Sequence, residues 1–165
     1  MNGFQHKNKM AAYKHIESSL NGLLGVGLIT FEAALTSLIA LVRENHPAVS
    51  WVGLYRAQQQ HLFVGPYQGK LACVHLKPGQ GVCGRAFLES KTLIVDDVLA
   101  FAGHVACDPL ARSEIVVPAY QNGELIGVLD LDSTEPAAFD AYDQEQLEKL
   151  LKAIETLPER VILKG

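Results

Sequence analysis

The chain has 165 residues, of which 48% are hydrophobic and 19% charged, and its formal net charge at pH 7 is -4. This composition is typical of a compact globule that folds as one domain, residues 1–165, and the negative charge argues against a nucleic-acid partner. The longest apolar run, residues 23–29, is far shorter than the roughly 20 residues that cross a bilayer, so we expect no membrane association.

Two helices are predicted before residue 50. Residues 10–20 form the first, which the pair Asn21-Gly22 is expected to end. Thr30 is a good N-cap for a second helix that reaches residue 45. Its apolar residues recur at the spacing of one helical face: Phe31, Ala34, Leu35, Leu38, Ile39 and Val42.

Strands are predicted over residues 50–56, 61–67 and 70–76, then a short helix over 82–90, a brief strand over 92–95 and a long loop over 96–112. Asn122-Gly123 between the apolar runs 114–120 and 125–132 is the strongest hairpin signal. Asp140 caps a last helix that reaches residue 157. These elements predict an α+β fold, in which a central antiparallel sheet has the terminal helices on one face and loops over a ligand pocket on the other.

The sequence contains three cysteines, and an uneven number argues against a static extracellular disulfide framework. The first nine residues are polar and lack the apolar core of a secretory signal. We therefore expect a cytoplasmic protein whose thiols are buried, metal-bound or redox-active. Cys107 lies in a loop, Cys73 at the start of a strand, and Cys83 in the first turn of a helix, where the helix dipole lowers a thiol pKa. Any one of them taken alone is more often a buried small hydrophobe, Cys83 above all.

Acidic residues form a second set of candidates. Asp130 and Asp132 are two apart on one strand, so both carboxylates leave the same face, and Glu114 begins the partner strand. Two solvated aspartates at a strand end are an equally good interpretation of the pair. A cluster of such acids in a pocket would instead bind an ammonium group, and a protonated member could donate a proton.

Trp51 and Tyr55 point to the same side of the first strand, as core residues or as the wall of a pocket for a methyl group. A zinc site is a weaker alternative. Its ligands would come from Cys73-x-His75, Cys83 and His104-x-x-Cys107, but the chain has no paired Cys-x-x-Cys motif. We therefore expect no metal and no cofactor.

Five segments together resemble the free methionine-(R)-sulfoxide reductases, which are GAF-fold enzymes. The resemblance covers residues 51–148, departs from the family at Tyr67, where phenylalanine is usual, and places all three cysteines in family register. The segments are Gly65-Pro66-Tyr67-Gln68-Gly69-Lys70-Leu71-Ala72-Cys73, Gly81-Val82-Cys83-Gly84, Gly103-His104-Val105-Ala106-Cys107-Asp108, Ser113-Glu114-Ile115-Val116-Val117-Pro118 and Gly127-Val128-Leu129-Asp130-Leu131-Asp132-Ser133.

The resemblance implies a six-stranded antiparallel sheet, a catalytic segment over about residues 51–133, and commonly a homodimer. It implies reduction of free methionine (R)-sulfoxide, with thioredoxin as electron donor. By resemblance Cys107 is the nucleophile, Cys73 the main resolving thiol and Cys83 a third thiol, and which of the last two resolves stays open. The substrate-binding residues would be Glu114, Asp130, Asp132, Trp51 and Tyr55.

These residues permit a cycle in which the Cys107 thiolate attacks the sulfoxide sulfur while Glu114 or Asp132 protonates its oxygen. A sulfenic acid would remain on Cys107, and Cys73 would convert it to a disulfide. The alternative is a non-catalytic GAF module that binds a small ligand and regulates a partner. A ligand sensor, however, has no need of three thiols beside three acids.

Overall fold

The computed structural model describes residues 3–105 and 107–161. Its helices are α1 (Gly3–Leu24), α2 (Phe31–Asn45), α3 (Gly81–Glu89), the short 3-10 helix η1 (Val98–Ala100) and α4 (Ala141–Ile154). Its strands are β1 (Trp51–Gln58), β2 (His61–Gln68), β3 (His75–Leu76), β4 (Leu93–Val95), β5 (Ser113–Gln121) and β6 (Glu124–Ser133).

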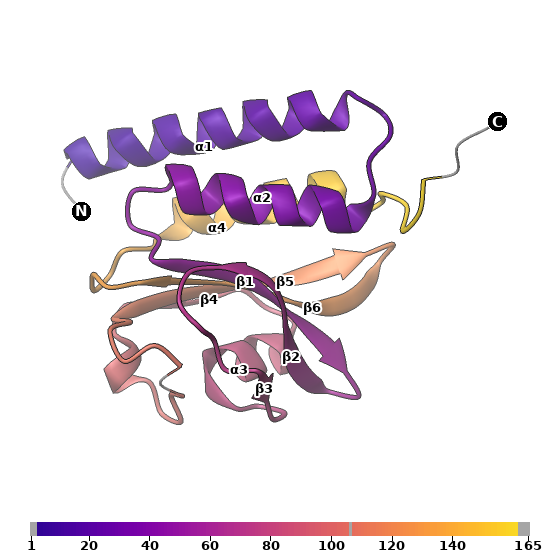
Figure 1. Ribbon diagram of the computed structural model, residues 1–165. Helices are drawn as coiled ribbons and strands as arrows, with labels where there is room; N and C mark the ends of the chain where they lie inside the picture. The colour runs from indigo at the N-terminus through magenta and orange to yellow at the C-terminus, as the bar shows by residue number, and fades with distance from the viewer. Residues whose placement is uncertain (1–2, 106, 162–165) are drawn as a thin grey trace.

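The strands form one six-stranded sheet in the order β3-β2-β1-β6-β5-β4, and every neighbouring pair is antiparallel. Helices α1, α2 and α4 lie on one face of this sheet, whereas α3 and the long loop after β4 lie on the other (Figure 1). The predicted α+β architecture is therefore confirmed. Among the described residues, no helix combines the length and apolar character that crossing a membrane requires.

The larger hydrophobic core lies between the sheet and the helices α1, α2 and α4. The Thr30 hydroxyl accepts a hydrogen bond from Ala33 N at the start of α2, and Asp140 and Asp143 form a capping box at the start of α4, so both predicted caps are confirmed. The face of α2 that the apolar spacing predicted is buried: Phe31, Ala34, Leu35, Leu38, Ile39 and Val42.

A buried ionic network joins α1 to the start of α4. Lys9 Nζ lies 2.5 Å from Asp143 Oδ2, and the other carboxylate oxygen is 3.0 Å from His46 Nε2 and 3.1 Å from the Tyr13 hydroxyl, which donates to it. Burial alone would raise the pKa of Asp143, but the hydrogen bonds and charges of His46 and Lys9 outweigh it and lower that pKa. The network stands on the helix side of the sheet, away from all three cysteines.

Three predicted elements differ from the structure by more than two residues. Helix α4 ends at Ile154, three residues before the predicted end at residue 157. Helix α1 runs from Gly3 to Leu24, beyond the Asn21-Gly22 pair, and its last turn closes with a hydrogen bond from Gly25 N to Asn21 O. The predicted strand over residues 70–76 is reduced to β3, because Gly69 takes φ +137° at the end of β2 and turns the chain out of the sheet. Residues 70–74, which include Cys73, are an irregular segment.

The predicted hairpin between β5 and β6 is confirmed. Gln121 pairs with Glu124, and Asn122 and Gly123 between them have φ values of +51° and +83°, as a two-residue turn of this type requires. This turn, together with a β-bulge between Ala119 and Tyr120 that shifts the pairing by one residue, sets the register of β5 against β6. Because Leu129 and Leu131 pack into the helix-side core, the alternation of the strand directs Asp130 and Asp132 to the opposite face.

Candidate active site

The sheet register brings the three candidate acids together. Asp132 pairs with Glu114 of β5 on one side and with Trp51 of β1 on the other, and the next pair on the same face joins Asp130 to Gly53. Residues paired across antiparallel strands share a face and have Cβ atoms about 5 Å apart. The hairpin of β5 and β6 therefore places three carboxyl groups on the α3 side of the sheet, beside Trp51 of β1.

These carboxyl groups are withdrawn from water and crowd one another. Glu114 and Asp130 are each 6% exposed. Burial, followed by the charge of Asp132, raises the pKa of Glu114 to about 8, although hydrogen bonds with Asp130 and Cys83 oppose this rise. Burial and neighbouring acids also raise the pKa values of Asp130 and Asp132. At neutral pH the cluster therefore holds protons that it can donate.

Cys83 is a buried free thiol that belongs to this cluster. It is 3% exposed, and its Sγ donates a hydrogen bond to Glu114 Oε1 at 3.7 Å. Burial, with added effects of Asp130 and Glu114, raises the pKa of the Cys83 thiol. The expectation that the start of α3 lowers this pKa is therefore wrong, because desolvation and nearby acids outweigh a helix dipole.

The other two cysteines form a disulfide. Cys73 in the irregular segment after β2 and Cys107 in the loop before β5 are 34 residues apart, with a Cα–Cα distance of 5.3 Å. Both residues are partly exposed. The pair thus lies where a thiol from another molecule can reach it, as reversible oxidation and reduction require.

Two small cavities of about 30 and 20 Å³ lie next to this disulfide. The residues common to both walls are Tyr55, Cys107, Asp108, Asp130 and Asp132. Since one water molecule needs roughly 10–15 Å³ of such space, neither cavity admits an amino acid in the disulfide form.

Aromatic rings form one wall of the smaller cavity. The Trp51 ring stacks on Tyr55 with centroids 6.0 Å apart and on Tyr67 with centroids 5.4 Å apart. The indole lies flat because two glycines leave room for it. A Cβ at Gly53 would come within 2.5 Å of Trp51 Cη2, and one at Gly69 within 2.4 Å of Trp51 Cδ1. Trp51 and Tyr55, both predicted as core or pocket wall, serve as both.

Asp108 is a member of the site that the sequence reasoning did not single out. Its side chain is 11% exposed, lines both cavities, and lies 3.4 Å from Lys70 Nζ. It also accepts a hydrogen bond from Leu110 N at 2.9 Å, which shapes the turn after Cys107. The available signal was an acid directly after Cys107 and before a proline. The ion pair with Lys70 joins the two cysteine-bearing segments.

The ligand set considered for zinc is not brought together as free ligands. Cys73 and Cys107 are oxidised to a disulfide, and His75 stacks instead on His61 and Phe63, with ring centroids 4.9 and 4.8 Å away. The described residues that could share a cation are Cys83, Glu114 and Asp130, whose ligand atoms all lie within 4.8 Å of one another. These are the members of the acid cluster itself.

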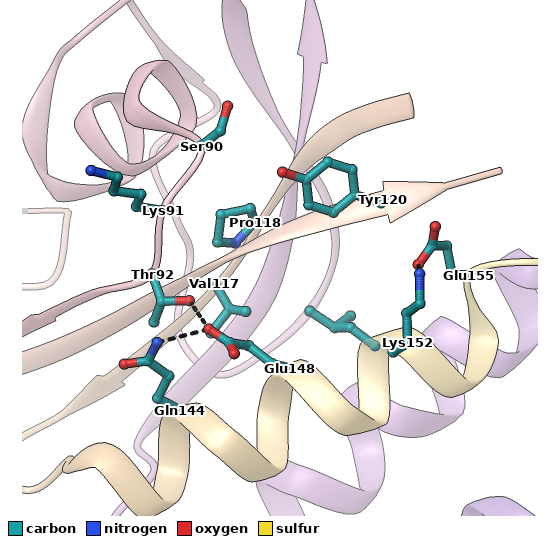
Figure 2. Close-up of a pocket in the computed structure, with 11 residues that line it drawn as sticks. Ser90, Lys91, Thr92, Val117, Pro118, Tyr120, Gln144, Glu148, Lys152 and Glu155 are labelled. Carbon is teal, nitrogen blue, oxygen red and sulfur yellow. Dashed lines mark hydrogen bonds and ion pairs between the residues drawn. The ribbon is translucent and has the colours of Figure 1, made fainter. Parts of the chain in front are cut away.

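A larger hollow of about 430 Å³ lies between β5, α4 and the chain after α3, and Figure 2 shows its lining. Five of its polar side chains pair with one another: Glu148 accepts hydrogen bonds from Thr92 and Gln144, and Lys152 pairs with Glu155. None of the cysteines and none of the three acids lines it. Although this hollow is larger, the reactive groups of the described chain gather at the two small cavities.

Comparison with known proteins places the chain in a family. A model of the GAF domain matches residues 29–156. The free methionine-R-sulfoxide reductase of Escherichia coli strain K12 is 38% identical over 148 residues, which cover 90% of this chain and 89% of the relative. The solved structure of the reduced form of fRMsr of Staphylococcus aureus is 41% identical with a TM-score of 0.80, covering 87% of this chain and 92% of that one.

A second solved structure is the free methionine-R-sulfoxide reductase from Neisseria meningitidis in complex with its substrate. It is 38% identical with a TM-score of 0.76, and the alignment covers 87% of this chain and 84% of that one. Identity at this level extends over most of the chain in all three comparisons. The chain belongs to the free methionine-(R)-sulfoxide reductase family of GAF-domain proteins.

Proposed function

We propose that this protein reduces free L-methionine (R)-S-oxide to L-methionine, with Cys107 as the nucleophile. The observation that carries the proposal is the Cys73–Cys107 disulfide next to a cavity walled by Asp130, Asp132 and Glu114. The relatives named for this activity support it. A disulfide between partly exposed residues can be reduced and formed again, and the protonated acids beside it supply the proton that the sulfoxide oxygen takes up.

In the first step the Cys107 thiolate attacks the sulfoxide sulfur, and Glu114 donates a proton to the sulfoxide oxygen, with Asp132 as the alternative donor. The oxygen is transferred to Cys107, methionine leaves, and Cys107 remains as a sulfenic acid. The carboxyl groups that stay ionised bind the substrate ammonium, which a peptide-bound methionine lacks. Trp51 and Tyr55 contact the methyl group.

In the second step the Cys73 thiolate attacks the Cys107 sulfur, the S–S bond forms, and the S–O bond breaks to release water. An external dithiol then reduces the disulfide and completes a two-electron cycle. Cys83 is a less suitable resolving thiol, because its raised pKa leaves little thiolate. We further propose thioredoxin as that dithiol, a cytoplasmic location and a homodimer, on the strength of the family resemblance.

The test is turnover of the two methionine sulfoxide epimers with dithiothreitol, measured as free methionine. We expect the R epimer to be reduced and the Cys107→Ser variant to have no multiple turnover, whereas Cys73→Ser performs one turnover and stops. Multiple turnover by Cys107→Ser would refute the assignment. Binding of methionine sulfoxide without any reduction would instead favour the ligand-sensor alternative.

Thioredoxin is tested by replacing dithiothreitol with thioredoxin, thioredoxin reductase and NADPH, and following NADPH oxidation. Oxidation that depends on the R epimer supports the partner. Its absence, while dithiothreitol still drives turnover, would exclude thioredoxin alone. Light scattering on the eluted protein tests the dimer, for which a mass of about twice the 18.0 kDa of one chain is expected.

A further inference from the structure

The segment that carries Cys73 is attached to the sheet by few hydrogen bonds, although Ala72 and Cys73 also pack against the apolar cluster around Trp51 and Tyr55. Residues 70–74 lie between β2 and β3 and form no strand, and one backbone hydrogen bond, from Val64 N to Val74 O at 3.1 Å, joins their end to β2. Two further hydrogen bonds come from side chains of β1. Trp51 Nε1 donates to Lys70 O, and the Tyr55 hydroxyl donates to Cys73 O, each at 3.1 Å.

The two side chains that hold this segment are themselves rigid. Tyr55 is 2% exposed and Trp51 is 4% exposed, and their rings stack on the α3 side of the sheet. Burial, followed by the charge of Asp130, raises the pKa of Tyr55, so its hydroxyl keeps its proton and remains a donor. The same rings that wall the cavity therefore reach across to the backbone of the resolving-thiol segment.

We infer that Tyr55 is a positioning residue whose hydroxyl holds the backbone of Cys73, and with it the Cys73 thiol, against Cys107 in the reduced protein. The effect of this role on the rate of disulfide formation rests on the proposed function. It assigns to Tyr55 a role beyond contact with the methyl group of the substrate. Trp51 supports the same segment three residues earlier, at Lys70.

The kinetic consequence arises because the cavities of the disulfide form have no room for an amino acid, so we expect residues 70–74 to lie farther from Cys107 while substrate occupies the reduced protein and to approach it again afterwards. On return, the Cys73 sulfur must reach the sulfenic sulfur of Cys107, form the S–S bond and displace the oxygen as water. With the disulfide open, the covalent link between the two segments is gone. The position of Cys73 then depends on the hydrogen bonds to its segment and on the Lys70–Asp108 ion pair.

The test is Tyr55→Phe, which keeps the ring and removes the hydroxyl. Reduced protein is mixed with one equivalent of methionine sulfoxide, and methionine release, sulfenic acid trapped by dimedone, and disulfide are followed in time. A neutral hydrogen bond is worth about 1 kcal/mol, so the rate of disulfide formation relative to methionine release should fall about fivefold, and sulfenic acid should accumulate. Cys73→Ser provides the reference for full accumulation.

Tyr13→Phe is the matched control, because it removes another buried hydroxyl that donates a hydrogen bond, on the helix side of the sheet. It should not alter the ratio of the two rates. If Tyr55→Phe slows methionine release and disulfide formation equally, with no trapped sulfenic acid, Tyr55 acts through substrate binding alone and the inference is overturned.

A second measurement does not depend on reductase activity. Lys70 has a side chain that is 61% exposed, and Leu71 after it is 88% exposed, so the bond between them is a site for trypsin once the segment moves. In reduced protein without substrate, Tyr55→Phe should be cleaved at this bond about fivefold faster than wild type. Equal cleavage would overturn the inference even if the reductase activity is established, and faster cleavage would support it even if that activity is absent.

Discussion

Replacing Glu114 with glutamine should stabilise the protein at alkaline pH while it lowers activity. Glu114 is 6% exposed, pairs with Asp132 across β5 and β6, and has its pKa raised from 4.5 to about 8. When the pKa of a group is higher in the folded than in the unfolded chain, the protonated group adds to the free energy of unfolding. That stabilisation is complete below about pH 4.5 and is lost as the pH rises through about 8.

The magnitude follows from the two pKa values. At 1.36 kcal/mol for each pKa unit, the change from 4.5 to about 8 corresponds to at most about 5 kcal/mol of unfolding free energy. Glutamine resembles the protonated acid and cannot ionise, so the variant escapes this loss. Since about 1 kcal/mol moves Tm by roughly 2–4 °C in a chain of this size, the difference at pH 9 should reach several degrees.

The assay is thermal unfolding of the oxidised protein without substrate, followed by circular dichroism at pH 5, 7 and 9. Glu124→Gln is the matched control, since Glu124 is exposed at the start of β6 and its replacement should leave the pH dependence unchanged. If the Tm values of wild type and Glu114→Gln run parallel from pH 5 to 9, the account of this cluster as buried, proton-holding acids is wrong. Turnover of Glu114→Gln should fall about 100-fold or more if this residue is the donor.

Three further predictions follow from the same structure. First, kcat/KM for the sulfoxide should decline as the pH rises through about 8, because Glu114 loses its proton; a constant value up to pH 9.5 would argue against it as donor. Second, Asp143→Asn should cost about 1–3 kcal/mol in urea denaturation, because it removes the buried carboxylate that binds Lys9 and His46 and leaves Lys9 only its weaker pair with Asp140, and a loss below about 0.5 kcal/mol would contradict the network. Third, Gly53→Ala should cost about 1–3 kcal/mol and raise KM by displacing Trp51. Gly22→Ala, with open space around its Cβ, should not destabilise; equal losses would refute the steric explanation.

Much of the fold could be predicted from local patterns. Helical spacing predicted the buried face of α2, the caps Thr30 and Asp140 were recognised from their residue types, and Asn122-Gly123 predicted the hairpin. Strand alternation also predicted that Asp130 and Asp132 share a face. Each of these features depends on residues that are close together in the chain, so it can be predicted from a short stretch of sequence.

The site was predictable in part. Its residues came from motifs and a family resemblance, and the same resemblance suggested that Cys73 reacts with Cys107, a pairing the structure contains. Spacing alone could not supply that pairing. Asp108 was missed as a cavity residue, because its contact with Lys70 joins two segments 38 residues apart.

Tertiary structure decided the properties that depend on distance and on water. The sequence placed Cys83 at a helix start, which favours a thiolate, but packing removed the thiol from solvent and set Asp130 and Glu114 beside it, which raises its pKa instead. Residues 70–74 leave the sheet after Gly69, and side chains of β1 that are far away in sequence bind their backbone. Periodicity determines which face a residue occupies; the charge it carries there is determined by the atoms that surround it, and only the folded chain brings those atoms together.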